Sequence, residues 1–123
     1  MLAACPEVPG LIRERGCAAG IVLRVETEVA VATRWLDGAA FLTLLGTEIG
    51  VKGQSLSPRA TARLRQARAL ADAHGLFLAA DGGIRETTVP ALRAAGAETV
   101  VLGSLAFGDP DLAARIGWLR ALG

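Results

Sequence analysis

The sequence has little of what nucleic-acid-binding proteins depend on. Lysine and arginine together number 13 of the 123 residues and aspartate and glutamate 12, so the formal net charge is only +1. Aromatic residues make up 4% of the chain, and tyrosine is absent. Without a surplus of positive charge or a supply of stacking side chains, the chain is not expected to bind nucleic acid. The same charge balance gives no basis for binding an anionic membrane surface.

Cysteine is also scarce, with Cys5 and Cys17 as the only two. They have neither metal-ligand spacing nor the density of a secreted disulfide scaffold, which predicts free thiols in a reducing cytoplasm. A Cys5–Cys17 disulfide stays an open alternative. The opening "MLAAC" lacks the basic and apolar segments of a signal peptide. No apolar run approaches the roughly 20 residues of a membrane helix. We therefore predict a cytoplasmic chain with no membrane partner.

Hydrophobic residues are abundant, at 52% of the chain, which predicts one packed domain over residues 1–123. Most of them occur in short runs that alternate with segments of helical spacing. The runs are expected to be strands, at about 17–24, 40–47, 76–81 and 99–104, with a helix before the first and a further strand considered at "LAAC".

These strands are continuous apolar runs, which predicts that both faces of the sheet are buried. Such runs are typical of a parallel sheet with helical crossovers, so the predicted fold class is α/β. A repeating unit of about 25 to 30 residues suits both a (β/α) barrel and a doubly wound sheet. Four or five parallel strands make only half of a barrel. We therefore expect a partner to cover the open face and edges, either as a homo-oligomer or as a complementary half.

Helix signals are strongest in "SLSPRATARLRQARALADAHG". Ser57 is the expected N-cap, Pro58 the first helical residue and Gly75 the terminator. The arginines of this segment are expected on a solvated outer face. For the last helix, Asp109 is the expected cap and Pro110 lies in the first turn.

Three loops that follow strands contain glycine: "GTEIGVKGQS", "ADGGIRE" and "LGSLAFGDP". Glycine lets backbone N–H groups approach an anion, and a helix N-terminus adds positive potential. For any one loop, a glycine that simply makes a turn is the simpler interpretation. Two such loops on the last two strands favour a phosphate site, with Gly82 and Gly83 in one loop and Gly103 and Ser104 in the other.

Three segments match one protein family in order and in spacing: "GCAAGIVLRVETE", "LLGTEIGVKGQSLSP" and "AADGGIRETTVPALRAAGAETVVLGSLAFG". They resemble the C-terminal half of ribulose-phosphate 3-epimerase. The resemblance covers nearly the whole chain, and its most specific parts are the Gly-x-x-Gly-Gln loop, the Asp-Gly-Gly-Ile turn and the Gly-Ser pair followed by Phe107. It implies a (β/α)8 TIM-type barrel, of which this chain would form strands four to eight.

The resemblance also implies a mechanism. A phosphorylated ketopentose loses a proton at C3 to one carboxylate, passes through an enediolate and is reprotonated on the opposite face by a second carboxylate. A divalent metal ion stabilises the enediolate oxygens. Asp81 matches one carboxylate, which acts as acid or base and as a metal ligand. The implied phosphate-binding positions are Gly82, Gly83, Gly103 and Ser104, and those implied for the loop that covers the substrate are Gly50 and Gly53.

The other half of such a site has no match in this sequence. In the family, the second carboxylate and the histidine ligands belong to the first three strands, and the single histidine here, His74, is expected at a helix end far from the site. We therefore predict that the isolated chain is inactive. Glu48, Lys52 and Arg24 depart from the family pattern and put the substrate in question. Glu48 is either a loop hydrogen-bonding residue or a substrate contact, and Lys52 either an exposed cation or a phosphate contact.

Two alternatives stay open. One is another phosphate-binding barrel enzyme that acts on a different sugar phosphate, against which the Gly-Gln loop argues. The other is a non-catalytic half-barrel that binds a phosphorylated ligand or a partner chain, which the missing acid and histidines favour.

Overall fold

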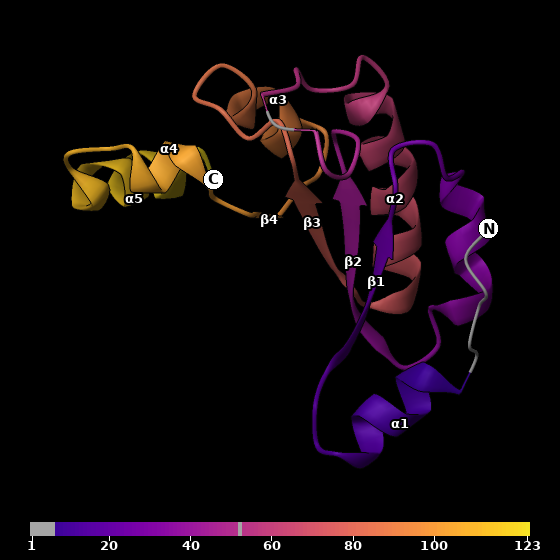
Figure 1. Cartoon of the computed structure of the whole chain (residues 1–123). Helices are drawn as coiled ribbons and strands as arrows, with labels where there is room; N and C mark the ends of the chain where they lie inside the picture. Colours follow the sequence, from indigo (N-terminus) through magenta and orange to yellow (C-terminus); the bar gives the residue numbers. More distant parts are fainter. Residues whose placement is uncertain (1–6, 52) are drawn as a thin grey trace.

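Parallel strands form one sheet in sequence order, β1-β2-β3-β4 (Figure 1). The computed structural model describes residues 7–51 and 53–123. Within them the strands are Ala19–Leu23 (β1), Ala39–Leu45 (β2), Phe77–Asp81 (β3) and Thr99–Val100 (β4). The α/β class is confirmed. Sequential strand order is the order of a barrel, whereas a doubly wound sheet reverses its order near the middle, so the structure favours the half-barrel.

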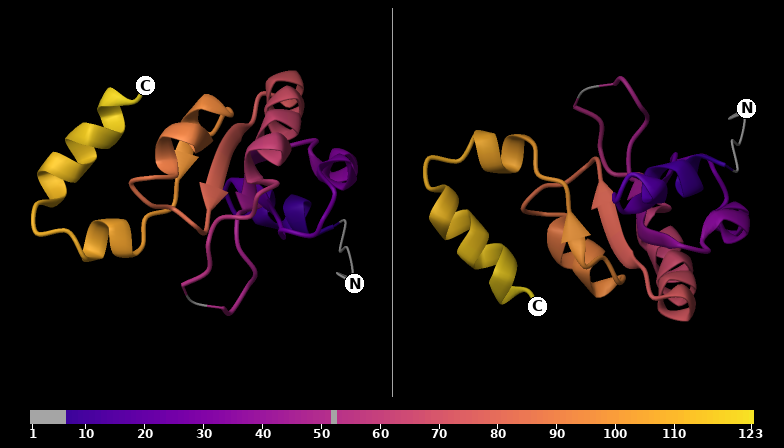
Figure 2. Two further views of the ribbon diagram at one scale, coloured as in Figure 1. Left: turned by 90° about the horizontal axis from the view of Figure 1, so that it is seen from above. Right: turned by 90° about the horizontal axis from the view of Figure 1, so that it is seen from below.

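Helices connect the strands and extend past the last one. In Figure 2, the chain after β4 runs beyond that edge of the sheet, on the side away from the helix that follows β2. No helix among the described residues has both the length and the apolar character needed to cross a membrane. The helices are Val8–Glu14 (α1), the 3-10 helix Val29–Trp35 (η1), Ala60–His74 (α2), Val89–Ala94 (α3), Ser104–Phe107 (α4) and Leu112–Ala121 (α5).

The first three predicted strands agree with the structure to within two residues at each end, but the fourth was predicted too long. Its ladder covers only Thr99–Val100, and one more hydrogen bond joins Val101 N–H to the Ala80 carbonyl at 3.0 Å. This strand lies at the edge of the sheet, and the backbone turns at Gly103 into α4. The strand considered at "LAAC" lies outside the described residues.

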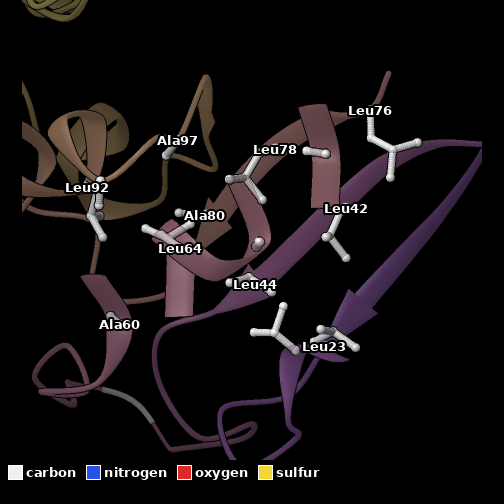
Figure 3. Packing of buried hydrophobic residues seen from close by; sticks show 14 of the residues in the cluster. Leu23, Leu42, Leu44, Ala60, Leu64, Leu76, Leu78, Ala80, Leu92 and Ala97 are labelled. Carbon is white, nitrogen blue, oxygen red and sulfur yellow. The ribbon is translucent and has the colours of Figure 1, made fainter. Parts of the chain in front are cut away.

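One face of the sheet is packed against helices, and this is where the core lies. Leu42 of β2 and Leu78 of β3 are both 0% exposed, and Leu64 of α2 packs with them (Figure 3). Small side chains let α2 lie close to the strands, since Ala67 and Ala71 are fully buried. The cluster extends to Leu23, Val29, Ala32, Leu36, Leu44, Leu76, Ala80, Ile84, Val89 and Leu92.

The opposite face is uncovered, so the prediction that both faces are buried is wrong for this chain by itself. Phe41 and Phe77 stack there with ring centroids 6.0 Å apart, and they are 42% and 56% exposed. Val22 and Val101 are also exposed. Strand residues alternate between faces, so the apolar runs supply two faces while the described helices pack against one. The predicted open core face is therefore present.

The long helix α2 begins later than predicted. Its first residue is Ala60, because the Ser57 hydroxyl accepts a hydrogen bond from Arg59 N–H at 3.2 Å and its carbonyl accepts one from Ala60 N–H at 3.0 Å. These bonds form a turn that precedes the helix. The terminator is confirmed, since Gly75 has φ +67° at the C-cap.

The cap of the last helix is Asp111 rather than Asp109. The Asp111 carboxylate accepts from Ala114 N–H at 3.0 Å, whereas Asp109 accepts from Asp111 N–H at 2.9 Å and pairs with Arg115 at 2.7 Å. The backbone N–H of Asp111 and then the Arg115 guanidinium lower the pKa of Asp109. Pro110 thus precedes α5 instead of lying in its first turn.

Candidate functional site

The carboxyl ends of β2 and β3 lie side by side, because Leu45 pairs with Asp81 in the parallel register. Gly46 N–H donates to the Asp81 carbonyl at 2.7 Å and continues this pairing past the ladder. A pocket of about 170 Å³ opens at the carboxyl ends of β3 and β4, lined by Asp81, Gly82, Gly83, Ile84, Arg85, Val101, Gly103 and Ser104. The structure thus brings Asp81 together with the four residues predicted to bind phosphate.

Asp81 is half-buried at the end of β3, on the same face as Phe77, because residues two apart share a face of a strand. Among the described residues that line the pocket, it is the one that bears a carboxylate. An acid in this position faces the side of the sheet that would be a barrel interior, at the end where barrel enzymes place their chemistry.

The turn after Asp81 requires glycine for a local reason. Gly82 has φ +87°, and a Cβ on it would overlap the Thr47 side chain of the neighbouring loop. Gly83 has φ +69°, and its Cβ would lie 3.0 Å from the Leu56 backbone. Both glycines therefore make a tight turn, which is the simpler of the two roles that the sequence suggests for them. The same turn leaves the peptide groups lining the pocket.

The second loop of the pocket differs from the first. A Cβ on Gly103 would meet no atom within 4 Å, so this backbone is open to an approaching group. Ser104 begins α4 directly after it. Because α4 has only four residues, its dipole is small, and the local peptide groups are the main source of positive potential there.

Two residues of the first loop were missed by sequence reasoning. Arg85 lines the pocket, and its guanidinium donates to the Gln54 carbonyl at 3.5 Å. Thr88 holds the turn closed, since its hydroxyl donates to the Gly83 carbonyl at 2.6 Å and accepts from Arg85 N–H at 2.9 Å. A basic residue directly after Gly-Gly-Ile was the available signal for Arg85. Nothing local distinguishes Thr88 from Thr87.

The loop predicted to cover the substrate lies beside the Asp81 pocket. Gly50 and Gly53 have φ of +82° and +74°, and both are exposed. They do not line the Asp81 pocket. The base of the loop is closed by Glu48 N–H, which donates to the Gln54 side chain at 2.8 Å. This contact is a loop hydrogen bond, although it uses the Glu48 backbone. Lys52 lies outside the described residues.

An arginine near this loop corrects the prediction of a solvated helix face. Arg63 of α2 is 4% exposed, and its guanidinium donates to the carbonyls of Arg24 at 2.7 Å, Thr27 at 2.8 Å and Leu45 at 3.3 Å. Burial, followed by the charge of Arg59, lowers the pKa of Arg63. The sequence pattern missed it because apolar spacing says nothing about a long side chain that reaches around its helix to backbone oxygens.

The described residues do not form a metal site by themselves. None of their His, Cys, Asp and Glu side chains gather in groups of three or more that could hold an ion. His74 is the last residue of α2, and its Nδ1 lies 3.8 Å from a carboxylate oxygen of Asp37. It lies at the amino end of the strands, as predicted, away from Asp81. Arg24, a departure from the family pattern, pairs with Glu26 at 2.8 Å.

The sequence is similar to a family of known enzymes. The model of the ribulose-phosphate 3 epimerase family matches residues 3–107. Ribulose-phosphate 3-epimerase 1 of Cupriavidus necator is 39% identical over 108 residues, which cover 83% of this chain and 45% of that protein. The ribulose-phosphate 3-epimerase of Escherichia coli K12 is 33% identical over 90% of this chain and 50% of its own length. The chain thus spans about half the length of these relatives.

This chain also matches only part of each of two solved structures. The crystal structure of 3-hexulose-6-phosphate synthase matches with a TM-score of 0.67 and 25% identity, over 95% of this chain and 55% of that one. A mandelate oxidase structure matches with a TM-score of 0.57 and 24% identity, over 97% and 36% of the two chains. The fold of this chain is therefore that of part of a larger α/β structure.

Proposed function

Because the chain belongs to the ribulose-phosphate 3-epimerase family, we propose that it supplies one half of a pentulose-phosphate 3-epimerase site. The reaction interconverts D-ribulose 5-phosphate and D-xylulose 5-phosphate at C3. The observation that carries the proposal is the single pocket in which Asp81 faces two glycine-bearing loops, from β3 and from β4. This pairing of an acid with backbone donors suits a substrate that has both an acidic carbon-bound proton and a phosphate.

Asp81 is the proposed acid or base. Its carboxylate removes the proton from C3 of one epimer, and the electron pair of the C–H bond passes into an enediolate. A second acid then protonates C3 on the opposite face, and the two roles exchange in the reverse reaction. The position of Asp81 at the carboxyl end of β3 supports this role. The second acid must come from outside this chain.

Four residues are proposed to bind the phosphate through backbone N–H groups: Gly82, Gly83, Gly103 and Ser104. Their place on the walls of one pocket supports this assignment. Arg85 lines the same walls and adds a positive charge that backbone amides lack. The Gly50 and Gly53 loop is proposed to cover the substrate, and this is supported by the exposure of both glycines, which have no neighbouring atom within 4 Å of their Cβ positions.

A divalent metal is implied by the family, but the residues described here do not fit one alone. Asp81 offers a single carboxylate, and within the described part of the chain it belongs to no group of three or more His, Cys, Asp and Glu side chains that could hold an ion. Carboxylate and histidine ligands from a complementary half would be needed to complete a coordination shell. The proton transfer assigned to Asp81 above is therefore derived without a metal.

The chain is proposed to be inactive until a complementary half, or a second chain, covers its open sheet face. The exposed side chains of Val22, Phe41, Phe77 and Val101 support such a partner, because a parallel sheet normally has both faces covered. Cytoplasmic location is part of the same proposal, supported by Cys17, an exposed free thiol.

The test is epimerase activity in a completed barrel. The chain would be expressed alone and together with the N-terminal half of the Cupriavidus necator relative, and assayed on D-ribulose 5-phosphate with added divalent metal. We expect no conversion by the chain alone and measurable conversion by the pair. Asp81→Asn should reduce the activity of the pair about 10²–10⁴-fold. Asp37→Asn, at the amino end of the strands, is the matched control and should leave it unchanged.

Equal activity of the Asp81→Asn and Asp37→Asn pairs would refute the role of Asp81. A non-catalytic half-barrel is the second candidate, and it is favoured by the lone carboxylate in the pocket. Amide chemical shifts of the isolated chain, titrated with inorganic phosphate, would separate the two. If phosphate shifts the amide signals of Gly82 and Gly103 in the isolated chain, and the pair nevertheless shows no activity, the result would favour the non-catalytic half-barrel. Turnover of a hexulose 6-phosphate instead would favour another phosphate-barrel enzyme.

A further inference from the structure

Arg63 is a buried charge at the carboxyl end of the sheet. It projects from α2, yet only 4% of its surface is exposed. Its guanidinium donates to the Leu45 carbonyl at the end of β2. It also donates to the carbonyls of Arg24 and Thr27, which belong to the segment after β1. One side chain therefore joins the end of β2 to the segment after β1.

The bond to Leu45 has a direct connection to Asp81. The Leu45 carbonyl and the Gly46 N–H belong to the same peptide group, and that N–H donates to the Asp81 carbonyl at 2.7 Å. Arg63 thus holds one side of a rigid, planar peptide whose other side holds the backbone of Asp81. Hydrogen bonds arranged in such a chain polarise and strengthen one another.

A role in packing alone does not account for this arginine. Burying a guanidinium is costly unless every donor finds an acceptor, and an apolar side chain of similar size would fill the space without that cost. All three of the bonds that Arg63 makes go to backbone carbonyls, and none goes to a carboxylate. Its fork of donors therefore orients backbone rather than neutralising an acid.

We propose that Arg63 is a positioning residue that sets the orientation of Asp81 through the Leu45–Gly46 peptide and anchors the segment after β1 beside it. The inference deepens the proposed function and rests on the role of Asp81 given above. Arg63 does not touch the pocket in which Asp81 lies. It would therefore act on the geometry of the acid and not on the bound phosphate.

The test uses the full chain with three substitutions: Arg63→Met, Arg63→Lys and, as the matched control, Arg65→Met on the exposed side of α2. Amide hydrogen exchange of Gly46 would be compared with that of Leu76, whose N–H bonds to the Ala71 carbonyl at the far end of α2. We expect Arg63→Met to raise the exchange rate of Gly46 relative to Leu76 at least tenfold. Arg63→Lys should have a smaller effect, and Arg65→Met none.

A second measurement separates positioning from simple loss of stability. At one fixed pH, the χ1-dependent three-bond couplings of the Asp81 side chain in the folded chain should change in Arg63→Met and return toward the original values in Arg63→Lys, but not change in Arg65→Met. If Arg63→Met does not fold, Arg63→Lys alone decides, through the Gly46 to Leu76 ratio. Equal exchange ratios and unchanged Asp81 couplings in every variant that folds would overturn the proposal.

These readouts need no enzymatic activity, so they stand even if the chain is not an epimerase. In the completed pair, Arg63→Met should lower kcat by at least tenfold with KM nearly unchanged. A paired assembly that is inactive with Arg63 intact, combined with the predicted exchange result, would refute the proposed function and leave the positioning role standing.

Discussion

Acidic residues at the two ends of the same sheet are treated in opposite ways. At the amino end, the Glu98 carboxylate accepts from Leu78 N–H at 3.0 Å and pairs with Arg68 at 2.9 Å. At the carboxyl end, Asp81 faces a pocket, and among the described residues no ion pair joins it to a basic side chain. One acid has its acceptors used within the protein, and the other is available to a ligand.

One glycine from each end, Gly75 and Gly82, shows a parallel difference. Gly75, at the amino end, has φ +67° and free space where a Cβ would lie. Gly82, at the carboxyl end, has φ +87° and is pressed against Thr47. At the amino end, the acid Glu98 is paired and the turn at Gly75 is relaxed. At the carboxyl end, the tight turn at Gly82 follows an acid that no basic side chain of residues 7–51 and 53–123 pairs with.

Substituting the two glycines should give the largest difference between the ends. Gly82→Ala combines a left-handed backbone with overlap of Thr47, so we expect it to lower the free energy of unfolding by about 3 kcal/mol. Gly75→Ala has no overlap with neighbouring atoms, so it should lower the free energy of unfolding only by the cost of a left-handed backbone, about 1 kcal/mol. Urea unfolding of both variants would measure this. Equal losses would mean that the turn after Asp81 relaxes easily and is no tighter than a helix cap.

Replacing each acid by its amide should change the free energy of unfolding less than the glycine substitutions do. Here the larger loss is expected at the amino end. Glu98→Gln keeps an acceptor for Leu78 N–H but loses the pair with Arg68. We expect it to lower the free energy of unfolding by less than about 1 kcal/mol, because 38% of the Glu98 side chain is exposed and solvent screens the pair. Asp81→Asn should change stability by less than about 0.5 kcal/mol. Urea midpoints would test this, and a larger loss for Asp81→Asn would show that Asp81 is structural.

The fold could be predicted from sequence because its signals are local. Apolar runs gave three strands closely, and Gly75 ended its helix as expected. The predicted end of the last strand and the predicted starts of α2 and α5 were wrong. These boundaries depend on competition between alternative hydrogen bonds. Asp109 has the right residue type for a cap, but it pairs with Arg115, and Asp111 takes the cap instead.

For the site, the sequence was informative where resemblance supplied a motif. The sequence predicts Asp81 and the two glycine loops at one site, and in the structure residues from all three line one pocket. Arg63 was assigned to solvent, because no pattern in one helix reveals that a side chain meets carbonyls from two other segments. Such long-range contacts appear only when the strands are brought together.

The smallest effect expected is the acid dependence of the amino end. The hydrogen bond from Leu78 N–H, and then the Arg68 guanidinium, lower the pKa of Glu98 from its usual value of 4.5. The folded chain therefore favours the ionised carboxylate, and this stabilisation is present above pH 4.5 and is lost as the pH falls through the lowered pKa. The stability difference between the original chain and Glu98→Gln should accordingly shrink below pH 4.5.

Arg68→Met sharpens this measurement, because it removes the guanidinium that pairs with Glu98 and leaves the hydrogen bond from Leu78 N–H to Glu98. Since the hydrogen bond from Leu78 N–H is the first cause of the lowered pKa, Arg68→Met should retain part of the acid dependence that Glu98→Gln removes. Urea unfolding at a series of pH values would compare the three chains. If Arg68→Met abolished the dependence completely, the ion pair rather than the backbone donor would hold Glu98 ionised. The amino end would then depend on a surface charge that salt can screen.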